Sequence, residues 1–356
     1  MKKTIAVLPG DGIGPEVVRQ AVKVLKSVAY KFGHEFIFRE GLIGAGAIQK
    51  TGRPLPEETL KLSRQADAIL LGAIGDPKYD KDPQAKIRPE QGLLKLRKSL
   101  NLFANLRPVK IYPQLLNISP LKNERIKKVD IMVVRELTGG IYFGQHRRYD
   151  GGYSASDLSV YTKNEITRVA KIAFNHASRR KKILHSIDKA NVLATSCLWR
   201  ETVSDLSEDY PEVEVVHMFV DTASMQLVKN PRQFDVILTE NMFGDILTDE
   251  ASVIAGSIGL LPSASIGDKH ALYEPIHGAF NKAAGKNIAN PIGTILSAAM
   301  MLKMSFQLDM EARAIERAIE KVIDCGFCTK EIAGENTEAE KILGTKEIGN
   351  LLAKLI

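Results

Sequence analysis

The alternation of short apolar runs with longer helical patterns constrains the fold of this chain most. Residues 4–8 and 66–71 are such runs, and helical patterns follow them over 15–30 and 92–100. After residue 163 the same order returns. Its expected elements are helices over 163–180 and around Trp199, and strands over 182–185, 213–219 and 234–238. This order predicts βα units packed on a largely parallel sheet, which is the α/β class.

The chain of 356 residues is longer than one hydrophobic core usually supports. Because domains of about 100 to 200 residues are the norm, the length predicts two domains. Residues 141–161 interrupt the alternation, since they are rich in Gly, Tyr and Ser, and we expect an irregular or hairpin excursion there. From residue 291 the pattern is helical almost throughout.

Charge, apolar content and cysteine use narrow the functional classes. The net charge is +7, but Lys and Arg are spread along the sequence and no aromatic-interleaved basic motif accompanies the densest run at 179–182, so we expect no nucleic-acid partner. No apolar stretch is long enough to span a membrane and the N-terminus lacks the apolar core of a signal peptide, which predicts a cytoplasmic protein. Cys197, Cys325 and Cys328 are too few for a disulfide framework or a zinc site, and we interpret them as ordinary thiols.

A glycine-rich segment, Pro-Gly-Asp-Gly-Ile-Gly-Pro-Glu, lies over 9–16 between a predicted strand and a predicted helix. Its glycines do not match the G-x-G-x-x-G of a dinucleotide fingerprint, and no Gly-Lys-Ser/Thr follows as in a P-loop. The segment therefore argues against a Rossmann fold. From the residues alone it is a turn into a helix, with Pro15 near the first helical position.

Asp245 and Asp249 are candidate metal ligands. They follow the predicted strand 234–238, and their i, i+4 spacing places both carboxylates on one face of a helix. Two such carboxylates repel each other unless a cation or a proton is shared, and hard oxygen ligands suit Mg²⁺ or Mn²⁺. The alternative is a solvated helix face.

Arg97, Arg107 and Arg135 are candidate carboxylate ligands, because the guanidinium group matches a carboxylate bidentately. Arg135 stands just after the apolar run 129–134, where a solvated role is less expected. Each arginine alone is more often structural. Lys189 could act as a base if desolvated and Tyr142 could donate a proton, although the residues alone single out neither.

Several motifs, taken together and in this order, resemble the isocitrate/isopropylmalate dehydrogenase family of β-decarboxylating dehydrogenases. They span nearly the whole chain, and they are Leu-Pro-Gly-Asp-Gly-Ile-Gly-Pro-Glu over 8–16, Val-Arg-Glu-Leu-Thr-Gly-Gly-Ile-Tyr-Phe-Gly over 134–144, Asp-Lys-Ala-Asn-Val over 188–192 and Asn-Ile-Ala-Asn-Pro over 287–291. The resemblance implies a two-domain α/β fold of the isopropylmalate dehydrogenase type, with a mixed, mostly parallel sheet. Residues 1–103 and 257–356 would form a cofactor-binding domain. Residues 104–256 would form a substrate, metal and dimerisation domain, with an arm at about 141–161.

The resemblance also implies a role for each candidate residue. The three arginines would bind the carboxylates of a malate-type substrate. The implied ligands of Mg²⁺ or Mn²⁺ are Asp221, Asp245 and Asp249, of which Asp221 would also lie near the substrate. Lys189 would take the hydroxyl proton as hydride leaves for NAD⁺, and Tyr142 would donate a proton after CO₂ is lost. The protein would be a homodimer with shared active sites, in which Lys189 and Asp221 serve the partner's cleft.

Residues 88–94 resemble the isopropylmalate branch of the family, in which Glu90, Leu93 and Leu94 would line the pocket for the substrate's alkyl arm. A third carboxylate facing these leucines would remain unpaired, at a cost of roughly 2 kcal/mol or more. The implied reaction is the oxidative decarboxylation of 3-isopropylmalate to 2-oxo-4-methylpentanoate with reduction of NAD, in leucine biosynthesis. The alternatives are a sibling enzyme for D-malate, tartrate or homoisocitrate, or a catalytically silent dimeric binding protein.

The expected cofactor segments depart from the family pattern. The family's H-G-S-A-P-D-I-A-G reads His-Gly-Ala-Phe-Asn-Lys-Ala-Ala-Gly over 277–285, so Lys282 replaces the aspartate that holds the adenosine ribose. Its G-G-P-K-W reads Gly-Asp-Pro-Lys-Tyr over 75–79. A lysine suits the 2′-phosphate of NADP, but the tyrosine that accompanies it in NADP-dependent members is Ala283, so we expect NAD over NADP. The expected cofactor-binding residues are Gly75, Asp76, Pro77, Lys78, Glu90, Glu274, His277, Gly278, Ala279, Phe280, Asn281, Lys282, Ala283, Ala284, Gly285 and Asn290.

Overall fold

The computed structural model describes residues 1–81 and 85–356, apart from the side chain of Asp80. The chain forms two compact units. The first unit comprises Met1–Asn101, Gln114–Ile118 and Ala255–Ile356, and the second comprises Leu102–Pro113 and Ser119–Ile254. These boundaries lie two residues from those expected for the domains, and the short stretch Gln114–Ile118 packs with the first unit. The functional division into a cofactor domain and a substrate domain stays a prediction.

The first unit contains a mixed, mostly parallel set of five strands in the order β2-β1-β3-β12-β11. Strands β1, β2, β3 and β12 are parallel, and β11 pairs antiparallel with β12. The strands are β1 (Lys2–Gly10), β2 (Glu35–Glu40), β3 (Ala68–Ala73), β11 (Pro262–Ile266) and β12 (Ala271–Pro275). All six residues of β3 are buried, as expected for a parallel strand with both faces covered.

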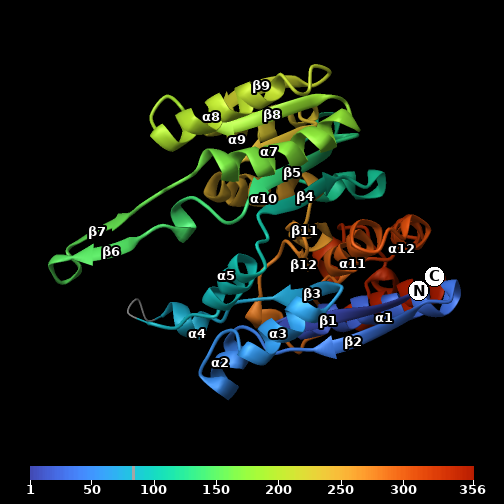
Figure 1. Cartoon of the computed structure of the whole chain (residues 1–356). Coiled ribbons are helices and arrows are strands. Elements are labelled where there is room, and N and C mark those ends of the chain that lie inside the picture. The colour runs from blue at the N-terminus through green and yellow to red at the C-terminus, as the bar shows by residue number, and fades with distance from the viewer. Residues whose placement is uncertain (82–84) are drawn as a thin grey trace. The chain divides into compact units, whose positions relative to one another are not determined.

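The helices of the first unit include α1, which packs against α11 and α13. Figure 1 shows α1 alongside the first strands of the chain. The helices are α1 (Gly14–Phe32), α2 (Ala45–Thr51), α3 (Glu57–Gln65), α4 (Pro77–Asp80), α5 (Glu90–Ser99), α11 (Ile292–Met304), α12 (Asp309–Asp324) and α13 (Thr345–Leu355).

The second unit has five strands in the order β4-β5-β10-β8-β9. Strand β4 is antiparallel to β5, and the other neighbours are parallel. The strands are β4 (Ala104–Lys110), β5 (Asp130–Glu136), β8 (Ile183–Asp188), β9 (Glu214–Phe219) and β10 (Val236–Thr239). The main helices are α7 (Lys163–Ser178), α8 (Ala194–Ser207), α9 (Val220–Lys229) and α10 (Asn241–Ala255).

The expected excursion at 141–161 contains an antiparallel hairpin of β6 (His146–Tyr149) and β7 (Ser154–Asp157). Figure 1 shows this hairpin extending away from the other strands and the helices of its own unit. All eight residues of the two strands are exposed. Beyond the hairpin, α7 begins with a capping box in which Thr162 and Glu165 satisfy each other's backbone N–H groups.

The glycine-rich segment forms the turn between β1 and α1. Gly10 and Gly12 have φ of +71° and +56°, in the left-handed region, and a Cβ on Gly10 would overlap the carbonyl oxygen of Ala73. Pro15 lies in the first turn of α1, as expected. Gly10 is therefore explained by the close approach of this turn to the end of β3, and Gly12 by its close approach to the carbonyl of Ala279.

The α/β class and the predicted alternation are confirmed, but one expectation about the tail is wrong. Helices were expected almost throughout from residue 291, whereas residues 325–344, between α12 and α13, contain two short 3₁₀ turns and an isolated β-bridge between Cys328 and Ile342. Gly326, with φ of +78°, ends α12 in the left-handed conformation that stops many helices. The three cysteines are free thiols, of which Cys325 is exposed and Cys328 is buried. No helix among the described residues is both long and apolar enough to cross a membrane.

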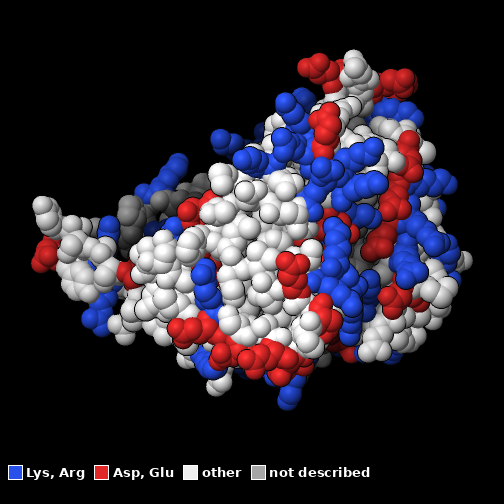
Figure 2. All heavy atoms as spheres, turned by 90° about the horizontal axis from the view of Figure 1, so that it is seen from above, with Lys and Arg blue, Asp and Glu red and all other residues white. Residues whose placement is uncertain are grey.

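The basic residues are less evenly spread in space than in sequence. Figure 2 shows Lys and Arg gathered mainly on the right-hand part of one face. Much of the positive charge of the second unit lies in four segments, which are residue 110 and residues 122–130, 179–182 and 229–235. Together they contain eleven of the 49 Lys and Arg of the chain but only three of the 42 Asp and Glu. Three of these segments precede the parallel strands β5, β8 and β10, and Lys110 ends the antiparallel β4. The four segments therefore meet at one edge, at the amino ends of β5, β8 and β10. The rest of the chain is close to neutral.

Candidate functional site

A charged cluster lies at the carboxyl ends of β5 and β10 in the second unit. Arg135 pairs with Thr239 across these parallel strands, and α10 begins at Asn241, two residues later. Arg135 therefore lies within β5 rather than after it. Its side chain is 3% exposed and donates from Nη2 to the amide oxygen of Asn241 at 2.7 Å and from Nη1 to Asp245. Asp245 therefore balances the charge of Arg135, and Asn241 fixes the orientation of its guanidinium group.

Arg107, in β4, reaches the same cluster. Its Nε donates to Asn105 at 2.6 Å, and its Nη1 donates to the hydroxyl of Thr248 at 2.5 Å. Its Nη2 lies 3.6 Å from the carboxylate of Asp245. Arg107 and Arg135 therefore place two guanidinium groups on one carboxylate, which makes these charge-assisted contacts strong.

Tyr142 also contacts Asp245. It lies in a 3₁₀ turn, Ile141–Phe143, and its hydroxyl donates to the Asp245 carboxylate at 3.1 Å. Partial burial raises the pKa of Tyr142, and the negative charge of Asp245 acts in the same direction. The phenol therefore keeps its proton at neutral pH, as a proton donor must.

Asp245 and Asp249 lie one turn apart on α10, which confirms the helical spacing predicted from the sequence. Partial burial raises the pKa of Asp249, the nearby Asp245 adds to this, and Arg107 and Arg135 oppose it. The carboxylate groups of Asp245 and Asp249 are suitable oxygen ligands for Mg²⁺ or Mn²⁺. Across residues 1–81 and 85–356, no three His, Cys, Asp or Glu side chains form a metal-binding group, so Asp221 does not complete this set within one chain.

Lys189 and Asp221 form a separate pair in the second unit. Lys189 directly follows β8, Asp221 lies in the first turn of α9, and Lys189 Nζ donates to the Asp221 carboxylate at 2.5 Å. This contact lowers the pKa of Asp221, whose side chain is 63% exposed. The pair therefore stands open to solvent in the single chain.

Asn241 and Thr248 are cluster residues that sequence reasoning missed. The amide oxygen of Asn241 accepts two N–H groups of Arg135, while its NH₂ group donates to the carbonyl of Gly139 at 3.1 Å. Both residues lie on α10 beside the aspartates, at i−4 from Asp245 and i−1 from Asp249. The helical period that identified the aspartates was a signal for Asn241 as well.

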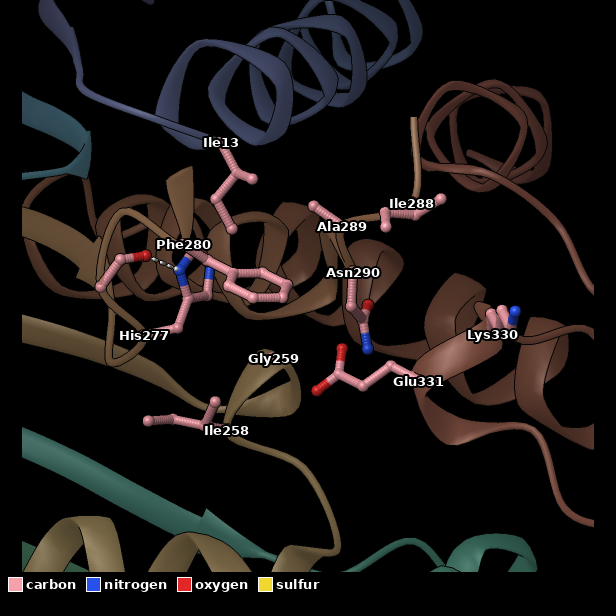
Figure 3. Close-up of a pocket in the computed structure, with 11 residues that line it drawn as sticks. Ile13, Ile258, Gly259, His277, Phe280, Ile288, Ala289, Asn290, Lys330 and Glu331 are labelled. Carbon is pink, nitrogen blue, oxygen red and sulfur yellow. Dashed lines mark hydrogen bonds between the residues drawn. The ribbon is translucent and has the colours of Figure 1, made fainter. Parts of the chain in front are cut away.

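A cavity of about 570 Å³ lies in the first unit, among residues expected to bind the cofactor (Figure 3). Four expected residues line it, namely His277, Gly278, Phe280 and Asn290. The remaining lining residues were not predicted, and they are Ile13, Ile258, Gly259, Ile288, Ala289, Lys330 and Glu331. Lys282 is exposed and does not line this cavity.

Two buried polar atoms at this cavity have no hydrogen-bond partner, His277 Nε2 and Asn290 Nδ2. The other ring nitrogen of His277 contacts the carbonyl of Gly278 at 2.9 Å, and burial lowers the pKa of the imidazole. Buried polar groups are usually satisfied, so these two atoms indicate a ligand with matching polar edges. A purine inside an otherwise apolar cavity fits this description.

The other expected cofactor and substrate residues of the first unit have varied surroundings. Arg97 Nη2 donates to Glu274 at 2.7 Å, so two residues expected to bind different ligands form a buried ion pair. Asp76 caps α4 by accepting from the backbone N–H of Lys78 at 2.9 Å. On α5, Glu90 is exposed while Leu93 and Leu94 are partly buried. Their binding roles stay predictions.

Comparison with known proteins identifies the family. The family model described as isocitrate/isopropylmalate dehydrogenase matches residues 4–352. A Heyndrickxia coagulans protein named 3-isopropylmalate dehydrogenase is 55% identical over 355 residues, covering 99% of this chain and 96% of that protein. An Aquifex aeolicus protein of the same name is 54% identical over 352 residues, covering 98% and 96%.

Solved structures of the same family are also similar to this chain. Isocitrate dehydrogenase from Methylococcus capsulatus superposes with a TM-score of 0.89 at 32% identity, covering 99% of both chains. A β-decarboxylating dehydrogenase from Thermococcus kodakarensis gives a TM-score of 0.78 at 36% identity, covering 99% of this chain and 96% of that one. The chain therefore belongs to the isocitrate/isopropylmalate dehydrogenase family.

Proposed function

We propose that the protein oxidatively decarboxylates 3-isopropylmalate to 2-oxo-4-methylpentanoate and reduces NAD⁺, as a step of leucine biosynthesis. The observation that carries the proposal is the 55% identity, over nearly the full length, to a relative named for this substrate. The cluster of Arg107, Arg135, Tyr142 and Asp245 supports it, because a dicarboxylate needs fixed cations and the reaction needs a proton donor.

The chain's own residues account for the proton movements. Lys189 takes the proton of the substrate hydroxyl as a hydride leaves the same carbon, and Tyr142 gives a proton to the carbon that loses CO₂. One proton is taken and one returned, so the net change is the transfer of hydride to the nicotinamide and release of CO₂. Arg107 and Arg135 hold the carboxylates in place throughout, and Arg97 is the third proposed carboxylate ligand.

Asp245 and Asp249 would hold Mg²⁺ or Mn²⁺, together with Asp221 of the second chain of a dimer. A bound divalent cation supplies positive charge beside the hydroxyl and carboxylate oxygens of the substrate. The dinucleotide would place its adenine in the cavity lined by His277 and Asn290. NAD is the proposed cofactor, because no second cation is found next to Lys282 within the segment 277–285.

A homodimer is part of the proposal. Helices α9 and α10 are joined by a hydrogen bond from Ser224 to Glu250 at 3.2 Å, and both carry exposed apolar side chains. These are Met225 and Val228 on α9 and Ile246 and Val253 on α10, each at least 41% exposed. Apolar surface of this kind marks interfaces. A twofold dimer through this surface would bring Asp221 of one chain near α10 of the other.

The test is the production of NADH and NADPH from a panel of 2-hydroxy diacids, with and without Mg²⁺. The panel contains 3-isopropylmalate, isocitrate, D-malate, tartrate and homoisocitrate. We expect the largest kcat/KM with 3-isopropylmalate, because Leu93 and Leu94 favour an apolar arm. A larger kcat/KM with any other diacid would replace the proposed substrate, and no turnover with any would favour a binding protein.

A further inference from the structure

We infer that Asn281 and Asp11 are positioning residues that together hold the backbone of Gly75 and thereby fix the segment 75–78 against the loop 277–285 for dinucleotide binding. The inference rests on the proposed function only in that both segments are taken to bind a dinucleotide. It assigns a role to Asp11, which lies in the glycine-rich turn, and to Asn281, at which this chain departs from its family.

Gly75 is held at both of its backbone polar groups. Its N–H donates to Asp11 Oδ2 at 3.0 Å, and its carbonyl oxygen accepts from Asn281 Nδ2 at 3.0 Å. Its φ of +131° lies in the region that favours glycine, so this conformation is not readily reached by another residue. Two side chains from distant parts of the sequence therefore hold the two peptide groups on either side of the Gly75 Cα.

Asp11 provides a fixed acceptor for the backbone N–H of Gly75. Its carboxylate is buried, with 6% of the residue exposed, and it also accepts from the backbone N–H groups of Ala45 at 3.0 Å and Gly46 at 3.1 Å. Its own backbone N–H donates to the carbonyl of Ala73 at 2.8 Å. A carboxylate that accepts three backbone N–H groups is committed to structure rather than to proton transfer.

Asn281 provides the second contact to Gly75, at its carbonyl oxygen. The loop that carries it is already joined to the N-terminal turn, because Ile13 N–H donates to the carbonyl of Ala279 at 2.8 Å. The side chain of Asn281 extends this connection to Gly75. The family pattern has a proline at this place, and a proline offers no side-chain donor. The bond is therefore a feature of this chain, and it adjoins the substituted Lys282.

The test compares Asn281→Ala with the wild type in the dinucleotide-free protein and in its complex with NADH. Calorimetric titration with NADH should show a Kd about three- to tenfold higher in the variant, the expected worth of one hydrogen bond. Amide hydrogen exchange over residues 75–79 should be faster in the variant without ligand. In turnover, KM for NAD⁺ should rise while kcat and KM for the diacid change by less than about twofold.

Asn336→Ala is the matched control, because Asn336 is an exposed asparagine of the same unit outside both segments. Asn281→Gln keeps the amide donor and should recover part of the NADH affinity. Unchanged NADH affinity and unchanged exchange in Asn281→Ala would overturn the inference. A wild type that binds NADH but does not oxidise 3-isopropylmalate would refute the proposed substrate and leave this result readable. A wild type that binds neither NADH nor NADPH would overturn both.

Discussion

The two aspartates of α10 have different surroundings, and this difference defines a test of metal binding. Asp245 is engaged by Arg107, Arg135 and Tyr142, whereas the side chain of Asp249 has no such direct partner among the described residues, and its pKa is raised mainly by partial burial. An oxygen ligand without a competing cation contact is the easier one to give to a metal. Asp249 is therefore the informative position to change.

We expect Asp249→Asn to weaken Mg²⁺ affinity by about tenfold or more, since even indirect contacts to a metal are worth that much. Turnover should fall, while the circular dichroism spectrum should stay that of the wild type because the side chain is not part of the core. The measurement is activity titrated with Mg²⁺. A variant with wild-type turnover and wild-type metal response would refute the assignment of Asp249.

Lys282 is the residue that bears most directly on the choice of dinucleotide. It is exposed in a 3₁₀ turn, Asn281–Ala283, next to the buried Ala283. One lysine without the accompanying tyrosine should not overcome the desolvation of a 2′-phosphate, so we expect the wild type to prefer NAD⁺. We expect Lys282→Asp to widen this preference, because an aspartate repels the phosphate and accepts from ribose hydroxyls.

The experiment compares kcat/KM for NAD⁺ and NADP⁺ in the wild type and in Lys282→Asp. A tenfold preference of the wild type for NADP⁺, equivalent to about 1.4 kcal/mol, would reverse the cofactor assignment.

Glu240 gives the protein a pH-dependent stability that was not visible in the sequence. It is 5% exposed at the end of β10, accepts from the hydroxyl of Ser196, and has a pKa raised to about 7, mainly by burial. Because its proton is bound more tightly in the folded state, Glu240 stabilises the fold most below its unfolded pKa. This contribution is lost as pH rises through about 7.

We expect Glu240→Gln to remove this dependence. The variant should match the wild type near pH 4 and should be more stable at pH 8, by at most about 3 kcal/mol. Urea unfolding midpoints at the two pH values provide the measurement. A wild type that becomes relatively more stable than the variant as pH rises would contradict the sign of the effect.

Among the secondary-structure elements, those with strong periodicity were predictable. The apolar runs in the sequence form the strands β1, β3, β8 and β10. Helices α1 and α7 bury regularly spaced apolar residues. Strand β2 escaped prediction because three of its six residues are charged and none of its residues is fully buried. Strands β11 and β12 lack long apolar runs, and their pairing depends on each other.

The candidate site shows the same limit more clearly. The i, i+4 spacing of Asp245 and Asp249 is local, so the sequence alone predicts it. The contacts of Arg135 with Asn241 and Asp245 depend on the pairing of β5 with β10, which joins residues about a hundred positions apart. The role of Asp11 depends in the same way on Gly75, and a local turn was the only feature visible beforehand.

The basic segments that carry most of the net positive charge lie away from the candidate site. The basic segments precede β5, β8 and β10, whereas Arg135, Lys189 and α10 lie at the opposite ends of the same strands. The field of the basic edge is screened over about 8–10 Å at ordinary ionic strength. The arginines of the cluster, rather than the net charge of +7, therefore determine how an anion is held at the site.

The proposed dimer makes the strongest prediction for the whole molecule. In one chain Asp221 pairs with Lys189 and does not form a metal-binding group with the α10 aspartates, as expected if both serve the partner's cleft. Asp245→Ala and Lys189→Ala should each be inactive alone. In a mixed dimer, one cleft receives both lesions and the other receives neither. Random pairing makes about half the dimers mixed, so co-expression should restore roughly a quarter of wild-type activity. If the residues act within one chain, every cleft keeps a lesion, and a mixture whose exchange is verified by native mass spectrometry stays inactive.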